Sequence, residues 1–312
     1  MSTFKEIQGQ NIRSLSSDPS PAVNGDIWYN STSQTLKGVM EVSAWSSGGN
    51  LGTGRYSLGG AGTQTSGIVF GGYPYTTATE EYDGSAWTGG GNLGTPRQKI
   101  MGIGVQTAAI ACGGYNPGVR DLSESYNGTS WSEGNNLTTG KSHTKGAGTE
   151  STGIVTGGLG PSVSDTNTTN VYNGTSWTAG GTLGTTRSAN ALAGNSTTGL
   201  TFGGTTTSAA TEEYNGSSWT AGGDMNTGRR NLAGRGTQTA AIAFGGTTGS
   251  VTTATEIYDG TAWSSTSSMG TATQNHAGSG TTSAAFAAGG QPDTDKTEEF
   301  TIAATTKTFT TS

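Results

Sequence analysis

Few side chains in this sequence have the chemistry of a catalytic or metal-binding site. The sequence contains two histidines, His143 and His276, and a single cysteine, Cys112. A metal site needs three or four converging donors, and no ligand spacing surrounds these residues. An oxidase or a lyase would also need a histidine cluster or paired carboxylates. We therefore expect no enzymatic activity, no metal and no cofactor, and we expect Cys112 to be a small buried core residue.

One polar pair recurs along the chain. A basic residue stands ten residues after a tryptophan at Arg55, Arg97, Lys141, Arg187 and Arg229, and Thr273 takes the sixth place. Glutamate stands two residues before an aromatic residue at Glu80, Glu124, Glu212, Glu256 and Glu298, and Asn170 takes the remaining place. A catalytic acid does not recur in every unit of a repeat. We interpret the pairs as structural ion pairs within one repeat unit, which specify register.

These residues belong to an internal repeat. Tryptophans recur 42, 44, 46, 42 and 44 residues apart, at Trp45, Trp87, Trp131, Trp177, Trp219 and Trp263. Each is followed 26 residues later by a Gly-Gly pair, which begins at Gly71, Gly113, Gly157, Gly203, Gly245 and Gly289. A period of this length is typical of solenoids and propellers. The sequence therefore contains six equivalent units.

Each unit is predicted to contain four short strands. The first covers a segment such as Arg55–Gly62, the second is a short apolar run that ends at Gly-Gly, the third carries an aromatic residue and the fourth begins at the tryptophan. Asp-Gly or Asn-Gly between the last two strands, as at Asp83-Gly84, predicts a hairpin with a type I′ turn. The glycine that ends each first strand, such as Gly62, suggests a close backbone approach where strands converge near an axis.

Six units of four antiparallel strands predict an all-β, six-bladed β-propeller. The strand at Trp45 has no earlier strands to pair with, and residues 274–302 lack a tryptophan strand. We therefore predict that the Trp45 strand completes the last blade and closes the ring.

Composition excludes several other classes. The chain has 312 residues, 55 glycines, 12% charged residues and a net charge of −6. A negative net charge argues against a nucleic-acid partner held by phosphate contacts. No apolar run approaches the roughly 18 residues of a transmembrane helix, so we expect no membrane insertion. A single cysteine excludes an internal disulfide framework.

The repeat resembles that of the kelch family, whose motif has Gly-Gly at the end of the second strand, then Tyr, Trp and an Arg about ten residues later. The match covers about residues 36–302, with Lys141 and Thr273 departing from the pattern. The resemblance implies a kelch-type propeller. It does not imply one function, because propellers host unrelated activities.

A second resemblance concerns the N-terminus. Gly25, Asp26, Trp28, Tyr29 and Asn30 resemble the leader of structural proteins from tailed bacteriophages. This resemblance implies a virion protein, namely a tail fibre, head fibre or capsid decoration on the surface of an extracellular particle. Residues 1–34 would form an arm that attaches to other virion proteins, and residues 35–312 would form the propeller. We also predict a homo-oligomer, trimeric or higher, that assembles through this arm.

The loops between the second and third strands vary in length and share one face of a propeller with the loops that carry the arginines. Such variation on one face of a repeat often marks a binding face. The aromatic and polar residues suited to a sugar are Tyr73, Tyr75, Tyr115, Asn116, Arg120, Asp121 and Asp165. We expect this face to contact a host surface polysaccharide or receptor. Two alternatives stay open: the loops are tolerated surface insertions, or the chain is a bacterial carbohydrate- or protein-binding propeller outside any virion.

Overall fold

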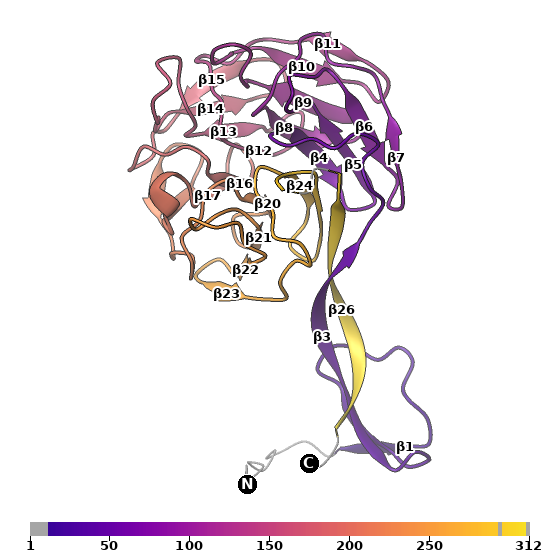
Figure 1. The fold of residues 1–312 in the computed structure, drawn as a ribbon. Coiled ribbons are helices and arrows are strands. Elements are labelled where there is room, and N and C mark those ends of the chain that lie inside the picture. Colours follow the sequence, from indigo (N-terminus) through magenta and orange to yellow (C-terminus); the bar gives the residue numbers. More distant parts are fainter. Residues whose placement is uncertain (1–11, 293–294, 310–312) are drawn as a thin grey trace. The chain divides into compact units, whose positions relative to one another are not determined.

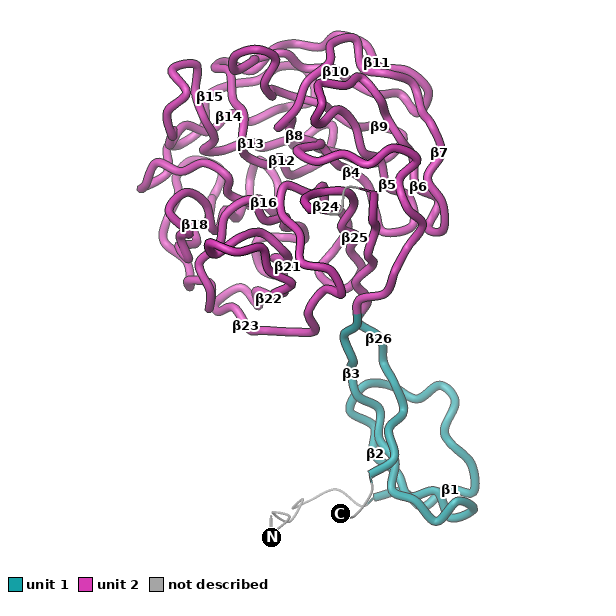
Figure 2. Tube along the Cα trace, in the orientation of Figure 1, with its two compact units in different colours: residues 1–44, 302–312 teal, residues 45–301 magenta. Residues whose placement is uncertain are grey.

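The computed structural model describes residues 12–292 and 295–309. These residues form strands and one short 3-10 helix, η1 (Thr205–Thr207). The chain divides into two compact units, shown in Figure 2: unit 1 contains residues 1–44 and 302–312, and unit 2 contains residues 45–301. This division falls later in the chain than the boundary expected after residue 34. The first eleven residues of the expected arm lie outside the described residues.

Unit 2 contains five four-stranded antiparallel sheets in which spatial order follows chain order (Figure 1). The first sheet has β4 (Gly59–Thr63), β5 (Ser66–Phe70), β6 (Thr79–Tyr82) and β7 (Trp87–Gly89). The second has β8 (Met101–Val105), β9 (Ala108–Cys112), β10 (Ser123–Tyr126) and β11 (Trp131–Glu133). The third has β12 (Gly146–Ala147), β13 (Ile154–Thr156), β14 (Thr169–Tyr172) and β15 (Trp177–Gly180).

The fourth and fifth sheets repeat this pattern. The fourth has β16 (Ala191–Gly194), β17 (Gly199–Phe202), β18 (Thr211–Tyr214) and β19 (Trp219–Ala221). The fifth has β20 (Ala233–Gly236), β21 (Ala241–Phe244), β22 (Thr255–Tyr258) and β23 (Trp263–Ser265). In all five sheets the fourth strand begins at the repeated tryptophan, as the sequence predicts.

A sixth sheet combines both ends of the described chain. Its order is β24 (Ala277–Gly280), β25 (Ala284–Ala288), β26 (Thr297–Phe309), β3 (Thr35–Ser47), β2 (Ile27–Asn30) and β1 (Arg13–Leu15). Residues 297–301 of β26 and 45–47 of β3 belong to unit 2, and the rest of both strands belongs to unit 1. Trp45 therefore lies in the same sheet as the last Gly-Gly repeat.

The first strands of the six sheets lie at the centre of unit 2 (Figure 1). Each contacts the first strand of the next sheet, from β4 through β8, β12, β16 and β20 to β24, and β24 contacts β4. Glycine permits the approach: a Cβ atom on Gly102 would lie 2.3 Å from the carbonyl oxygen of Gly60. We expected Gly62 to be a glycine because strands of different sheets converge there, and this explanation was wrong. Its φ is +99°, and its added Cβ would meet Ser66 O of its own hairpin at 2.2 Å.

The hydrophobic core lies between neighbouring sheets. Trp131 packs edge-on against Phe70 of the preceding sheet, with ring centroids 4.8 Å apart, and its indole N–H donates to Thr79 Oγ1 at 3.0 Å. Indole-to-threonine bonds of 2.9–3.1 Å recur as Trp87 to Thr297, Trp219 to Thr169, Trp263 to Thr211 and Trp45 to Thr255. Each repeated tryptophan in this set therefore joins its sheet to another.

The Gly-Gly pairs join the sheets a second time. The first glycine of each pair has a left-handed backbone, with φ between 61° and 69°. The second glycine donates its N–H to the carbonyl at the arginine position of another unit. These bonds, 2.7–2.9 Å long, run from Gly72 to Arg97, Gly114 to Lys141, Gly158 to Arg187, Gly204 to Arg229, Gly246 to Thr273 and Gly290 to Arg55.

Two local predictions need correction. The first strands begin later than expected: β4 starts at Gly59 rather than Arg55, because Ser57 has φ of 59° and cannot continue an extended strand. The hairpin between β6 and β7 is confirmed, but its turn is not type I′. The loop spans four residues, of which Gly84 alone has positive φ, and Asp83 Oδ1 accepts the N–H groups of Ser85 and Ala86 at 2.7 and 2.8 Å. This is an Asx-type turn.

Unit 1 has a small core of its own around Trp28, which is 2% exposed. Its indole N–H donates to Asp18 Oδ1 at 3.0 Å, and Asn30 Nδ2 donates to the same atom at 2.7 Å. Lys37 Nζ lies 2.8 Å from Asp18 Oδ2. These donors, Lys37 first, lower the pKa of Asp18 to about 2.

Candidate binding face

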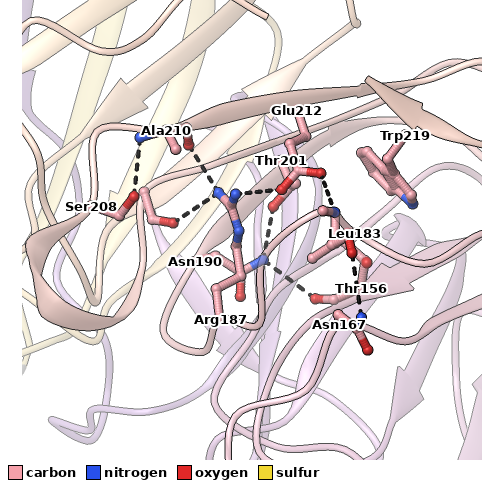
Figure 3. Close-up of polar contacts among 12 residues, drawn as sticks. Thr156, Asn167, Leu183, Arg187, Asn190, Thr201, Ser208, Ala210, Glu212 and Trp219 are labelled. Atoms are coloured by element: carbon pink, nitrogen blue, oxygen red, sulfur yellow. Dashed lines mark hydrogen bonds and ion pairs between the residues drawn. The ribbon is translucent and has the colours of Figure 1, made fainter. Parts of the chain in front are cut away.

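Buried arginine–glutamate pairs hold the loops of one face of unit 2. Figure 3 shows Arg187, whose guanidinium points at Glu212 and at the carbonyl of Ala210. The distances are 2.5 Å from Nη2 to Glu212 Oε1 and 2.9 Å from Nη1 to Ala210 O. The second carboxylate oxygen of Glu212 accepts the N–H of Gly184 at 2.7 Å. One pair therefore ties together the loop before Arg187, the loop after Gly-Gly and the third strand.

The same pair occurs in four units, which confirms the structural ion pairs. The other three join Arg55 to Glu80, Arg97 to Glu124 and Arg229 to Glu256 at 2.7, 2.5 and 2.9 Å. In the third unit, Lys141 Nζ donates to the carbonyls of Gly157 and Thr168, both at 2.9 Å. In the sixth, Glu298 instead accepts the N–H groups of Gly270 and Thr271. The bonds of these groups run to the loops of their own repeat units, which they support.

Six residues, one per unit, surround an axial depression on this face. These rim residues, each two positions after the arginine position, are Ser57, Lys99, His143, Ala189, Asn231 and Asn275. All six have left-handed backbone conformation, with φ between 52° and 59°. Five backbone N–H···O bonds of 2.5–2.9 Å link neighbouring rim residues, from Ser57 to Asn275, Asn275 to Asn231, Asn231 to Ala189, Ala189 to His143 and Lys99 to Ser57. Between Lys99 and His143 the side chains contact each other, Nζ against Nε2.

The axial depression is basic. Its mouth, a cavity of about 230 Å³, is lined by Lys99, His143, Arg230 and further rim residues. A smaller cavity of about 30 Å³ below the rim is lined by Lys99, His143 and Lys145. At the other end of the first strands, beside the glycines that end them, Arg235 lines a separate cavity of about 210 Å³, and its two terminal nitrogens donate to Gly146 O and Gly60 O at 2.7 Å each. We call Lys99, Lys145 and Arg235 the axial cations.

Burial and mutual repulsion perturb these groups. Desolvation lowers the pKa of Lys145 to about 7, and the positive charge of Arg235 contributes. Desolvation also lowers the pKa of Arg235 to about 10. Burial lowers the pKa of His143 to about 4; Lys99 adds to this effect and Asp165 opposes it. His143 is therefore neutral at pH 7 and can accept a hydrogen bond from Lys99.

The loops predicted to bind surround this depression. Tyr73 N donates to Tyr56 O at 2.8 Å, immediately before the rim residue Ser57, so the loop and the rim share one face. The Tyr73 ring stacks on Tyr56, with centroids 4.8 Å apart. Tyr75 stacks on Tyr115 of the next unit at 6.5 Å. Tyr73 and Tyr75 are 43% and 41% exposed. Three of the predicted residues, the exposed Tyr73 and Tyr75 and the half-buried Tyr115, thus form an aromatic surface on two adjacent loops.

The other predicted residues are less available. Arg120 donates from Nε to Asn116 O at 2.6 Å and from Nη2 to Pro117 O at 3.2 Å, so its guanidinium braces its own loop. Asp121 is exposed in the same loop. Asp165 lies in a different loop, where it pairs with Leu159 in a β-bridge and acts electrostatically on His143. The structure therefore brings the three predicted tyrosines together in one aromatic surface, whereas the predicted polar residues lie at separate positions on two loops.

The remaining chemically distinctive residues lie in the core. Cys112 is fully buried in β9, as predicted, and burial raises the pKa of its thiol to about 12. His276 is fully buried beside Phe244. Among the described residues, no group of three or more His, Cys, Asp or Glu side chains is placed to hold a metal ion. No helix of the described chain is long and apolar enough to span a membrane.

Comparison with known proteins supports the fold. No protein-family model matches the chain, and no curated protein matches it in sequence. Among solved structures, that of YjhT matches with a TM-score of 0.68 over 82% of this chain and 99% of that chain, at 13% identity. Together with the repeated four-stranded sheets, this likeness supports a β-propeller fold. At this identity the likeness concerns the fold alone.

Sequence analysis missed the axial cations. The signal is present in the aligned repeat: the position of Arg235 is Ala61, Ile103, Ala147, Ala193 or Ser279 in other units, and that of Lys145 is Gly59, Met101, Ala191, Ala233 or Ala277. A charge that interrupts a column of small and apolar residues marks a departure from what the fold requires. That these positions face one axis follows only from the structure.

Proposed function

We propose that the six sheets form a closed, six-bladed, kelch-type propeller in which the Trp45 strand completes the last blade. Three contacts support closure. Gly290 N donates to Arg55 O at 2.9 Å, which joins the sixth repeat unit to the first repeat unit. Tyr82 Oη donates to Glu299 at 2.5 Å across the same junction. Trp45 donates to Thr255, the bond that other repeated tryptophans make to a neighbouring sheet.

This propeller is a binding protein, a structural component of the virion of a tailed phage, and its loop face attaches to a host surface polysaccharide. The observation that carries the binding role is the aromatic surface of Tyr73, Tyr75 and Tyr115 on two adjacent loops. Sugars stack their apolar C–H faces on such rings, and an exposed tyrosine loses little conformational entropy on binding. A rigid β scaffold holds the loops in place.

The virion role rests on the N-terminal motif. Its residues Trp28 and Asn30 are buried in unit 1, and both donate to Asp18. The motif therefore contributes to the core of unit 1. In this proposal that unit attaches the protein to other virion proteins and assembles the homo-oligomer.

Binding is tested by applying the full-length protein to an array of bacterial surface polysaccharides. We expect saturable binding of at least one polysaccharide, weakened about tenfold or more by Tyr75→Ala or Tyr115→Ala, as expected for an aromatic anchor. The matched control is Tyr29→Ala, which removes a tyrosine of similar exposure, 38%, from unit 1. Equal binding by all three variants would contradict the role of the loop face.

The virion role needs a separate measurement. Mass spectrometry and imaging of purified particles should find the chain at a fixed copy number. Polysaccharide binding without particle association would instead indicate a bacterial carbohydrate-binding propeller.

A further inference from the structure

We propose that the axial depression is an oxyanion-binding site that takes the carboxylate or phosphate group of a ligand. It is separate from the aromatic surface and does not depend on the proposed virion role. Lys99 lines both the mouth and the smaller cavity below it, and Lys145 lines the smaller cavity. Arg230, exposed at the mouth, adds a further positive charge. An anion that enters this face therefore meets cations from several units.

The axial cations have no acidic partners within the part of the chain that the structure describes. Among the described residues, none of the axial cations forms a salt bridge. Lys145 Nζ donates to the carbonyl of His276 at 2.8 Å, and Arg235 donates to glycine carbonyls. Neutral carbonyls orient these groups but do not neutralise them. Half-buried cations without counter-ions are costly, and a bound oxyanion with charge-assisted hydrogen bonds would remove that cost.

The repeat shows that the fold does not require these charges. Asparagine occupies the position of Lys99 in two units, as Asn231 and Asn275, with the same left-handed backbone. Alanine occupies the position of Lys145 in three units and that of Arg235 in three units. The same structural positions are therefore filled without charge elsewhere in the ring. The three cations are an addition to the scaffold, and they lie along a single axis.

The carbonyl partners also fix where an anion would lie. Arg235 spans the axis, since it reaches Gly60 of β4 and Gly146 of β12 from β20. Both terminal nitrogens of Arg235 already donate to these glycine carbonyls. Arg235 therefore contributes positive charge rather than a bidentate pair of hydrogen bonds to the anion. Lys145 keeps donors beyond the one used on His276. The ligand group is therefore expected between Lys99 and Lys145, with its remaining atoms toward the mouth.

The repeat supplies variants that should fold. Lys99→Asn copies Asn231 and Asn275, and Lys145→Ala copies alanines at the equivalent position. Lys307→Gln is the matched control, because it removes one exposed lysine charge from unit 1. Each full-length variant is first compared with wild type by thermal denaturation and circular dichroism, so that loss of binding is separated from loss of fold.

Binding is measured by isothermal titration calorimetry at low ionic strength with inorganic phosphate, sodium glucuronate and neutral glucose. We expect saturable binding of phosphate or glucuronate but not of glucose. Lys99→Asn and Lys145→Ala should each weaken it about tenfold or more, the effect of losing a hydrogen bond to a charged group. Lys307→Gln should leave it unchanged. Tighter binding of glucuronate would identify an acidic sugar as the source of the group, and tighter binding of phosphate would identify a phosphate compound.

Two results would overturn the proposal. One is the absence of saturable binding of both anions to folded wild-type protein. The other is unchanged binding in the Lys99→Asn, Lys145→Ala double variant. Neither bears on polysaccharide attachment, because Tyr75→Ala and Tyr115→Ala leave the axial cations in place and should not alter phosphate affinity.

Discussion

Removal of one buried arginine should destabilise unit 2 far more than an average substitution. Arg97 is fully buried, and its guanidinium donates to Gly113 O at 2.7 Å, Leu122 O at 3.0 Å and Glu124 Oε1 at 2.5 Å. Arg97→Met removes all three bonds. It leaves the buried carboxylate of Glu124 with the N–H of Gly94 as its remaining protein donor. A negative charge would then stay in the interior without its counter-ion.

The expected cost follows from this geometry. Breaking a buried ion pair from one side costs about 3–5 kcal/mol. At about 2–4 °C per kcal/mol for a domain of this size, Tm should fall by about 6–20 °C. The measurement is thermal and urea denaturation, followed by circular dichroism and tryptophan fluorescence. Arg230→Met is the control, because Arg230 is exposed, and its cost should stay within about 0.5 kcal/mol.

The third unit supplies a compensated variant. Lys141 donates to two carbonyls equivalent to those that Arg97 contacts, and Asn170 accepts the N–H of Thr138 at 3.1 Å. The double variant Arg97→Lys, Glu124→Asn copies this arrangement and buries no unpaired carboxylate. It should therefore be more stable than Arg97→Met. If Arg97→Met costs less than about 1 kcal/mol, or if the double variant is the less stable of the two, the reasoning is refuted.

Three further predictions concern other parts of the chain. Trp45→Ala and Trp131→Ala should each destabilise unit 2 by about 3–5 kcal/mol. The two losses should be similar because each indole packs against a phenylalanine and donates a hydrogen bond to a threonine. A much smaller loss of stability for Trp45→Ala in thermal denaturation would contradict the proposed ring closure. Lysine and asparagine donors hold the pKa of Asp18 near 2, so its folded-state pKa lies below its unfolded value of 3.8. The stability it gives unit 1 is complete above that value and is lost as pH falls from about 4 toward 2; the indole N–H signal of Trp28 in NMR should report the change, and Asp18→Asn should abolish it. Cys112 should resist thiol reagents in the native protein and react only after unfolding, which a timed labelling assay would measure.

The sequence predicts the repeat well because its strongest signals are local. A tryptophan with a fixed partner, or a glycine with φ near 60°, satisfies the same local geometry in every unit, so residue type alone reveals it. The four-strand pattern and the ion pairs of Arg55 and Glu80 follow from such signals. The turn after Tyr82 does not, because Asp-Gly fits both a type I′ turn and the four-residue Asx turn observed. The choice depends on the register of β6 and β7, in which Tyr82 pairs with Trp87 and leaves four residues in the loop.

The axial depression lies beyond local prediction for a different reason. Lys99, Lys145 and Arg235 belong to three units and are separated by long stretches of chain, so their proximity depends on how the first strands are arranged around one axis. Sequence order gives no measure of that arrangement. Likewise, the stacking of Tyr75 on Tyr115 depends on the spacing of adjacent sheets. Both surfaces depend on how several sheets pack together.

Departures from the repeat can be sorted by what replaces the usual residue. Thr273 replaces the arginine of the other repeat units. The carboxylate of Glu298 accepts two backbone N–H groups instead, so other residues of the same repeat unit compensate for the lost arginine. Lys141 with Asn170 is compensated in the same way. Lys145 and Arg235 are different, because each introduces a charge where other repeat units need none, and no carboxylate in residues 12–292 or 295–309 forms a salt bridge with it. A replaced residue whose partners find other hydrogen bonds is a variation of the structure alone. A charge that lines an open cavity without a partner of opposite sign marks the place where we expect a ligand to supply that opposite charge.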